Sequence, residues 1–146
     1  MSPGAIDNIT AEEAGTLAGL FRERVRRTPD LPACRQYNEA TATWEDTSWQ
    51  EMGKHVARWQ AAMVTENLQP GDRVAILLRN CREWVMFDQA ALGCGLVVVP
   101  LYTDDRPENI AYILNNAGAK LLLLQDEEHW LRMLEVHDQL GGLLRI

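Results

Sequence analysis

Three short, uninterrupted apolar runs in the second half of the chain constrain its fold more than any other feature. They are Val74–Leu78, Leu96–Val99 and Leu121–Leu124, and apolar residues recur at helical spacing between them. Strands without polar alternation are typical of parallel sheets that are buried on both faces. The alternation of strand and helix therefore predicts an α/β unit over residues 50–146, with a parallel sheet covered by helices on both faces. Leu143–Ile146 has the composition of a fourth strand that is just beginning.

A helix and a hairpin are expected ahead of this unit. Thr10 and Glu13 have the spacing of a capping box, and the apolar residues behind them predict one helix over residues 10–28. Two short stretches around a polar loop indicate a small β-hairpin over residues 33–49. The same cap spacing recurs ahead of three later helices, at Ser48–Glu51, Asn80–Glu83 and Asp105–Glu108.

Composition and charge exclude several function classes. A chain of 146 residues with 47% hydrophobic and 24% charged residues is typical of one soluble globular domain. Its net charge of −7 argues against nucleic acid or an anionic membrane as a partner. No apolar run reaches the roughly 20 residues of a spanning helix, and the first ten residues lack a targeting pattern, so no transmembrane segment is expected. Three cysteines without a C-x-x-C pair favour a reducing compartment.

Spacing alone predicts no catalytic, cofactor-binding or metal-binding residue. Cys81 lies at a predicted helix start, but no base is near it in sequence, so we interpret it as an unreactive thiol. Asp126 follows a strand as a phosphoacceptor would, but the first strand lacks the acidic pair that such a site needs. Gly93 and Gly95 come between a helix and the next strand, the reverse of the dinucleotide-binding order, and indicate a helix end. The histidines lack the spacing of a metal-binding pair: His55, His129 and His137.

Four segments nevertheless resemble one family in their order and spacing. The most specific motifs are GDRVAI, N-x-x-E-W and VVVPLY, and the likeness covers residues 17–125. Together they resemble the N-terminal region of AMP-forming acyl-CoA synthetases, in particular bacterial long-chain fatty acid–CoA ligases. The four segments are TPDLPACR, TWEDTSWQEMGKHVARWQAAM, LQPGDRVAILLRNCREWVMFDQAALGCGLVVVPLY and PENIAYILNNAGAKLLLL.

The resemblance implies a parent enzyme that adenylates a fatty acid with ATP and Mg²⁺ and then forms a thioester with coenzyme A. In the family, the motifs that bind phosphate and adenine follow the matched region, and a C-terminal domain carries a catalytic lysine. Residues 1–146 are therefore expected to be the N-terminal part of the large AMP-binding domain. We expect this part to bind no cofactor and to be inactive alone. The implied location is the cytoplasm, with peripheral membrane association of the parent as the alternative.

No functional residue of the family can be placed on this sequence, because its known motifs lie outside the match. Tyr102 and Thr103 follow a strand at the end where α/β proteins usually bind ligands, so they are either part of a site wall or packed loop residues.

Two other functions remain open, and one association is expected. The chain could be a stand-alone α/β domain for binding or assembly, or part of a different adenylating enzyme, such as an amino-acid-activating domain or a short-chain acid ligase. The apolar end Leu143–Ile146 and an open sheet edge predict a homodimer.

Overall fold

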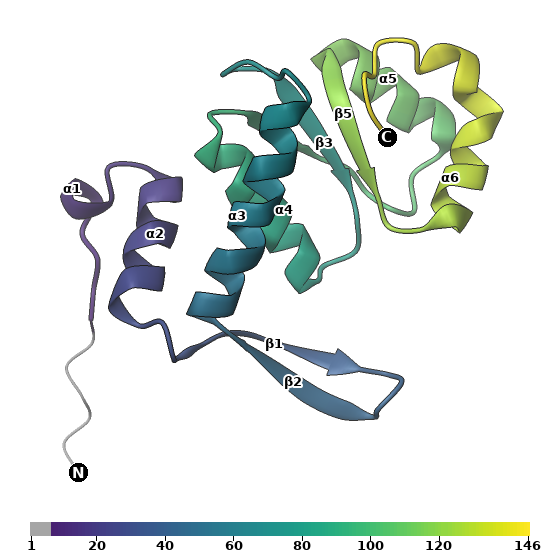
Figure 1. Cartoon of the computed structure of the whole chain (residues 1–146). Helices are drawn as coiled ribbons and strands as arrows, with labels where there is room; N and C mark the ends of the chain where they lie inside the picture. The colour runs from purple at the N-terminus through teal and green to yellow at the C-terminus, as the bar shows by residue number, and fades with distance from the viewer. Residues whose placement is uncertain (1–6) are drawn as a thin grey trace. The chain divides into compact units, whose positions relative to one another are not determined.

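The computed structural model describes residues 7–146, which form two units (Figure 1). The first unit ends at His55 and the second begins at Val56, so the boundary falls inside helix α3 (Trp49–Thr65). The expectation that no targeting signal occupies the first ten residues falls mostly outside the described part of the chain. Within that part, none of the helices has the length and apolar character needed to cross a membrane.

The first unit begins with two helices where the sequence predicted one. Residues 10–28 form α1 (Ala11–Ala14) and α2 (Leu17–Arg27), so the prediction of a continuous helix was wrong. Gly15 breaks the helix with a φ of 65°, a left-handed value that glycine adopts at little cost. The Thr16 hydroxyl then accepts a hydrogen bond from the Gly19 N–H at 2.9 Å, which caps a new helix.

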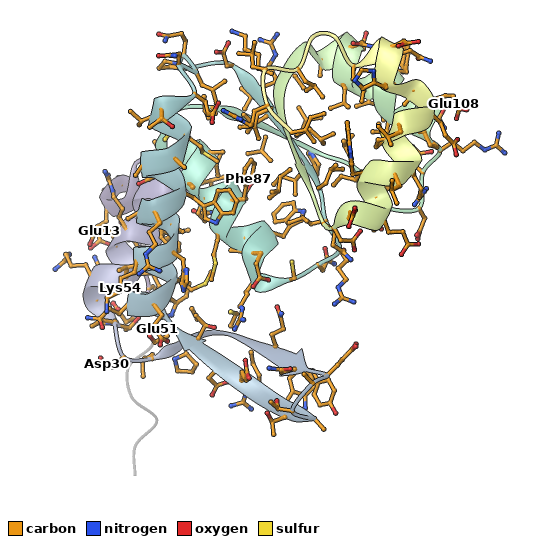
Figure 2. All side chains as sticks on the ribbon, turned by 45° about the vertical axis from the view of Figure 1, so that its right-hand side comes forward. Glu13, Asp30, Glu51, Lys54, Phe87 and Glu108 are labelled. Atoms are coloured by element: carbon orange, nitrogen blue, oxygen red, sulfur yellow. The ribbon has the colours of Figure 1, made fainter. Side chains whose placement is uncertain are left out.

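Two of the predicted capping boxes are confirmed, and Figure 2 labels their glutamates. The Glu13 N–H donates to Thr10 Oγ1 at 3.2 Å, and Glu13 Oε2 accepts from the Thr10 N–H at 2.8 Å. Ser48 and Glu51 make the same reciprocal pair at 3.2 and 2.8 Å. Each box satisfies two backbone N–H groups that a helix start would otherwise leave without partners.

The other two predicted caps are displaced by one residue. Helix α4 (Arg82–Gly93) has Cys81 as its N-cap, and α5 (Pro107–Ala117) has Arg106, neither with a side-chain cap bond. Proline at the first position fixes the start of α5, because its ring sets a helical φ and lacks an N–H. Asp105 instead accepts from the Arg106 N–H at 2.8 Å.

The hairpin is formed by β1 (Pro32–Asn38) and β2 (Thr43–Ser48), which pair antiparallel. The rings of Tyr37 and Trp44 meet edge to face across the strands, with centroids 5.5 Å apart. A hairpin was expected over residues 33–49 and is confirmed; its strands span residues 32–48, because Trp49 already begins α3.

The second unit is built on three parallel strands in the order β4-β3-β5, which confirms the predicted sheet. The expected fourth strand is reduced to one parallel bridge between Leu121 and Arg145. After β5 the chain forms an α-helix, α6, that continues as the 3-10 helix η1. The bounds are β3 Arg73–Leu77, β4 Val97–Pro100, β5 Ala119–Leu124, α6 Glu127–Met133 and η1 Leu134–Gln139.

Both faces of this sheet carry helices, as the apolar runs predicted (Figure 1). Ala75 and Leu77 pack in one buried cluster with residues of α5, α6 and η1. Val74 and Ile76 alternate with them along β3, so they point to the opposite face. Helix α4 lies on that side, and its fully buried Phe87 is labelled in Figure 2.

The GDR part of the GDRVAI motif ties together the starts of the strands. Asp72 accepts from the Gln69 N–H at 2.8 Å and forms an ion pair with Lys120, the second residue of β5, also at 2.8 Å. Arg73 Nε donates to the carbonyl of Ala117 at 2.6 Å, which satisfies an acceptor at the end of α5. The motif therefore has a structural role in this chain.

Replacing Gly118 with alanine is expected to lower the free energy of unfolding by about 1–2 kcal/mol. Gly118 has a φ of 63°, and a Cβ there would lie 2.7 Å from Nη2 of Arg73. Urea denaturation of the variant measures the loss. Gly141→Ala is the matched control, because its Cβ would meet no atom within 4 Å; an equal loss in both variants would contradict the explanation.

Candidate functional site

Three loops follow the carboxyl ends of the parallel strands. They are the β3–α4 loop (residues 78–81), the β4–α5 loop (residues 101–106) and the β5–α6 loop (residues 125–126). Ligands of open parallel sheets bind outside this end of the strands. We call the three loops together the carboxyl edge and treat them as the candidate site.

The β4–α5 loop is held at several points and presents an exposed aromatic side chain. The Leu101 N–H donates to the carbonyl of Ile76 at 2.9 Å, and the Asp105 N–H donates to that of Tyr102 at 3.2 Å. Arg132 from α6 donates to the carbonyls of Thr103 and Asp105. The side chain of Tyr102 remains 85% exposed. Of the two residues named from sequence, Tyr102 therefore projects from the edge, and Thr103 is anchored through its backbone.

Asp126 caps helix α6 rather than serving as a free carboxylate. It accepts from the backbone N–H of His129 at 3.0 Å, and one of its oxygens lies 2.7 Å from His129 Nδ1. These interactions with His129, side chain first, lower the pKa of Asp126 to about 2. A carboxyl group with so low a pKa is negatively charged throughout the physiological range. This explains the aspartate after β5 without any phosphoacceptor role.

A glutamine side chain joins two of the loops. Gln125 Oε1 accepts a hydrogen bond from the backbone N–H of Arg79 at 3.2 Å. Gln125 Nε2 donates to Asp126 Oδ2, also at 3.2 Å. The β5–α6 loop is thus connected to the loop that follows the neighbouring, central strand β3.

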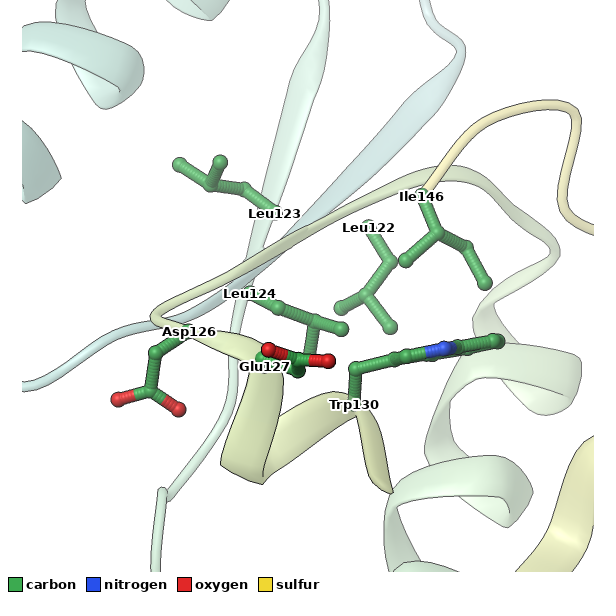
Figure 3. A pocket seen from close by; sticks show the side chains of 7 residues that line it. All are labelled: Leu122, Leu123, Leu124, Asp126, Glu127, Trp130 and Ile146. Atoms are coloured by element: carbon green, nitrogen blue, oxygen red, sulfur yellow. The ribbon is translucent and has the colours of Figure 1, made fainter. Parts of the chain in front are cut away.

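A pocket of about 440 Å³ opens beside the end of β5 (Figure 3). The ring of Trp130 and leucine side chains of β5 form apolar walls, and two carboxylates stand at its side. No basic side chain lines it, so this lining does not fit the triphosphate of a nucleotide, which carries the same sign of charge as the carboxylates. The lining residues are Leu122, Leu123, Leu124, Asp126, Glu127, Trp130 and Ile146.

The remaining candidate side chains do not assemble into a site. Within residues 7–146, no three His, Cys, Asp or Glu side chains are placed to hold a metal ion. Partial burial raises the pKa of the Cys81 thiol, which opposes formation of the nucleophilic thiolate. Gly93 ends α4, and Gly95 has a φ of 73° in the turn that follows.

Sequence reasoning missed the residues that organise the carboxyl edge. Arg132 and Gln125 act on residues that are 27 to 46 positions away in the chain. No local motif marks either residue. In the sequence, only their positions after the third predicted strand indicate that they lie near this edge.

Comparison with known protein families gives a match over most of the chain. A family model described as "AMP-binding enzyme" matches residues 21–143. The long-chain-fatty-acid–CoA ligase FadD15 of Mycobacterium bovis is 24% identical over 94% of this chain, which spans 22% of that relative. Surfactin synthase subunit 2 of Bacillus subtilis is 32% identical over 76% of this chain and 3% of its own length. The chain thus spans about a fifth of the FadD15 relative.

Solved structures agree on the fold. A fatty acyl CoA synthetase of Mycobacterium tuberculosis superposes with a TM-score of 0.77 at 20% identity, covering 91% of this chain and 26% of the other. The N-terminal domain of FACL13 from the same organism gives a TM-score of 0.75 at 21% identity, covering 88% and 32%. At these identities the likeness establishes the architecture alone.

Proposed function

The chain belongs to the AMP-binding enzyme family, and from this premise we propose that the whole protein is an acid–thiol ligase that activates a fatty acid. The observation that carries the proposal is the family match over residues 21–143, together with the FadD15 relative that aligns with 94% of the chain. In such a reaction, a carboxylate oxygen attacks the α-phosphorus of ATP and expels pyrophosphate, and the thiol of coenzyme A then attacks the acyl carbon of the acyl-adenylate and expels AMP.

The chemical need for ATP follows from the substrate. A carboxylate is a poor electrophile, and transfer of the adenylyl group from ATP to its oxygen makes AMP a good leaving group. When bound, ATP supplies that group, and Mg²⁺ neutralises the charge of the phosphates. The pocket at the carboxyl edge does not fit the phosphates of a nucleotide, because its lining is apolar and acidic. We therefore assign residues 7–146 a scaffold role in which the parallel sheet and its loops support a site completed elsewhere in the whole protein.

A long-chain fatty acid is the substrate class that we propose, because the FadD15 alignment covers more of the chain than the others reported above. An amino acid is the second candidate. It is favoured by the 32% identity to surfactin synthase subunit 2 over 76% of the chain. We further propose a cytoplasmic enzyme, with peripheral membrane association as the alternative, since a long-chain acid partitions into membranes.

The test is acid-dependent exchange of pyrophosphate with ATP by the whole protein, using panels of fatty acids and amino acids. Exchange with long-chain acids, followed by thioester formation with coenzyme A, would support the proposal. Exchange with an amino acid alone would select the second candidate. Absence of exchange with every acid would support the stand-alone binding domain.

The 146-residue chain by itself is expected to show no exchange above a boiled control. Its sequence contains no glycine-rich phosphate-binding stretch, and the pocket at the carboxyl edge repels phosphate groups. The assay is the same pyrophosphate exchange, with the whole protein as the positive control. Clear activity of the chain alone would show that phosphate recognition lies within these residues.

We also propose that two copies of this chain associate through the open side of β5. Leu144 and Arg145 pair only with the first half of β5, through backbone hydrogen bonds to Lys120 and Leu122, and both Leu144 and Ile146 are exposed beside it. Open strand edges with apolar side chains recruit further chains. Light scattering across a dilution series should show a dimer at high concentration, which Ile146→Lys weakens. A monomer at high micromolar concentration would refute this association.

A further inference from the structure

We propose that Gln125 and Arg132 are positioning residues that hold the three loops of the carboxyl edge in one fixed arrangement. As a statement about catalysis this rests on the function proposed above, whereas the arrangement itself can be tested without any substrate. Both residues follow β5, and each bonds to the backbone of a different loop.

Arg132 fixes the β4–α5 loop through two carbonyl groups. Its Nη1 lies 3.1 Å from the oxygen of Thr103, and its Nη2 lies 2.9 Å from the oxygen of Asp105. A planar guanidinium presents donors in a fixed fork, so one side chain sets the relative position of two peptide groups. These carbonyls lie one and three residues beyond Tyr102. Arg132 thereby determines where the backbone carries this exposed ring.

Gln125 makes the equivalent connection to the β3–α4 loop. Its side-chain oxygen accepts from the Arg79 N–H, a group just beyond the last residues of the central strand. Its side-chain nitrogen is itself held by Asp126, the cap of α6. Since α6 also carries Arg132, the cap, the glutamine and the arginine tie this one helix to both neighbouring loops.

A site that binds a reactive intermediate needs its walls fixed before the ligand arrives, because loops that order on binding reduce affinity. The β4–α5 loop also carries its own turn bond, from the Asp105 N–H to the Tyr102 carbonyl. We expect this turn bond to persist only while Arg132 holds the carbonyls of Thr103 and Asp105. In the proposed ligase, the two side chains would therefore fix the loops of the carboxyl edge before the ligand binds.

The experiment compares amide hydrogen exchange in the 146-residue chain and its variants by NMR. Arg132→Met removes every donor of the side chain and should speed exchange of the Asp105 amide about tenfold. Arg132→Lys keeps a cationic donor and should restore part of the protection. The Leu101 amide, at the start of the same loop, donates to the carbonyl of Ile76 in β3, so it should not change and serves as the internal control.

The glutamine variants supply a matched test of the other connection. Gln125→Met removes the acceptor and should speed exchange of the Arg79 amide about tenfold. Gln125→Glu keeps an acceptor for this amide but replaces the donor to Asp126 with a second carboxylate, so it should restore only part of the protection. Each variant should leave the amide of the other loop unchanged, because the two connections are separate.

Two results would overturn the proposal. One is unchanged exchange of Asp105 in Arg132→Met and of Arg79 in Gln125→Met. The other is acceleration of all amides together, which would mean that the side chains act only on global stability. Neither result depends on catalysis, so failure here is distinguishable from failure of the acid-activation proposal. If the loops prove to be fixed but the whole protein shows no acid-dependent pyrophosphate exchange, the arrangement stands and its proposed role in catalysis is removed.

Discussion

Replacing Ile76 with aspartate should abolish folding of the second unit. Ile76 is fully buried in β3, with strands paired on both of its sides. Loss of its apolar burial costs about 1.5–3 kcal/mol. An unpaired carboxylate in the interior costs several kcal/mol more, since it must either lose its water or take up a proton. The sum is comparable with the total stability of a domain, about 5–15 kcal/mol. Circular dichroism and urea denaturation should show no cooperative transition of this unit.

Two variants separate burial of charge from other effects. Ile76→Val keeps the apolar character and should cost about 0.5–1.5 kcal/mol. Val64→Asp adds the same charge to α3 at a side chain that is 71% exposed, and should change stability by about 0.5 kcal/mol at most. A soluble Ile76→Asp chain with an unchanged cooperative transition would show that residues 74–78 are not a buried strand.

The parallel sheet could be predicted because its strands are apolar on both faces. Val74–Leu78 lies between helix-forming stretches, and so short an apolar run is typical of a strand that is covered on both sides. The same reasoning was less successful at Leu143–Ile146, where composition indicates a strand and the structure has a single bridge. Strand length depends on available partners, which local composition does not contain.

Helix boundaries were predicted well where two side chains cap each other and less well elsewhere. Thr10–Glu13 and Ser48–Glu51 form reciprocal boxes, and both were identified from spacing. At Asp105 the spacing was present, but Pro107 moved the start of α5 by one residue. The break at Gly15 was also missed, because the apolar periodicity of the sequence continues across it.

The organisation of the carboxyl edge could not be predicted from sequence. Tyr102 was identified because it follows a strand, a rule that needs only local information. Arg132 and Gln125 form hydrogen bonds with backbone groups of other loops. Because nearly every residue has a backbone carbonyl and N–H, the sequence does not indicate which of these groups will be bonded. Residues that recognise backbone are therefore found only once the strands have been placed side by side.

Phe87→Ala is expected to have the largest effect of any simple truncation in the second unit. Phe87 is the largest of the fully buried side chains, and its ring meets that of Trp59 edge to face, with centroids 5.3 Å apart. Removing it deletes the buried apolar area and leaves a cavity beside the sheet, which together cost about 3–5 kcal/mol. Urea denaturation measures this loss, when the dependence of the unfolding free energy on urea concentration is the same for both proteins.

Tyr112→Ala is the matched control, because this aromatic side chain on α5 is 69% exposed and its loss should cost about 0.5 kcal/mol or less. A double-mutant cycle with Trp59→Ala isolates the ring contact from burial. Since an edge-to-face pair contributes about 0.5–1.5 kcal/mol beyond its area, the two truncations should be less than additive by that amount. Strict additivity would mean that the two rings stabilise the unit independently. A loss in Phe87→Ala no greater than that in Tyr112→Ala would contradict the placement of Phe87 between α4 and the sheet.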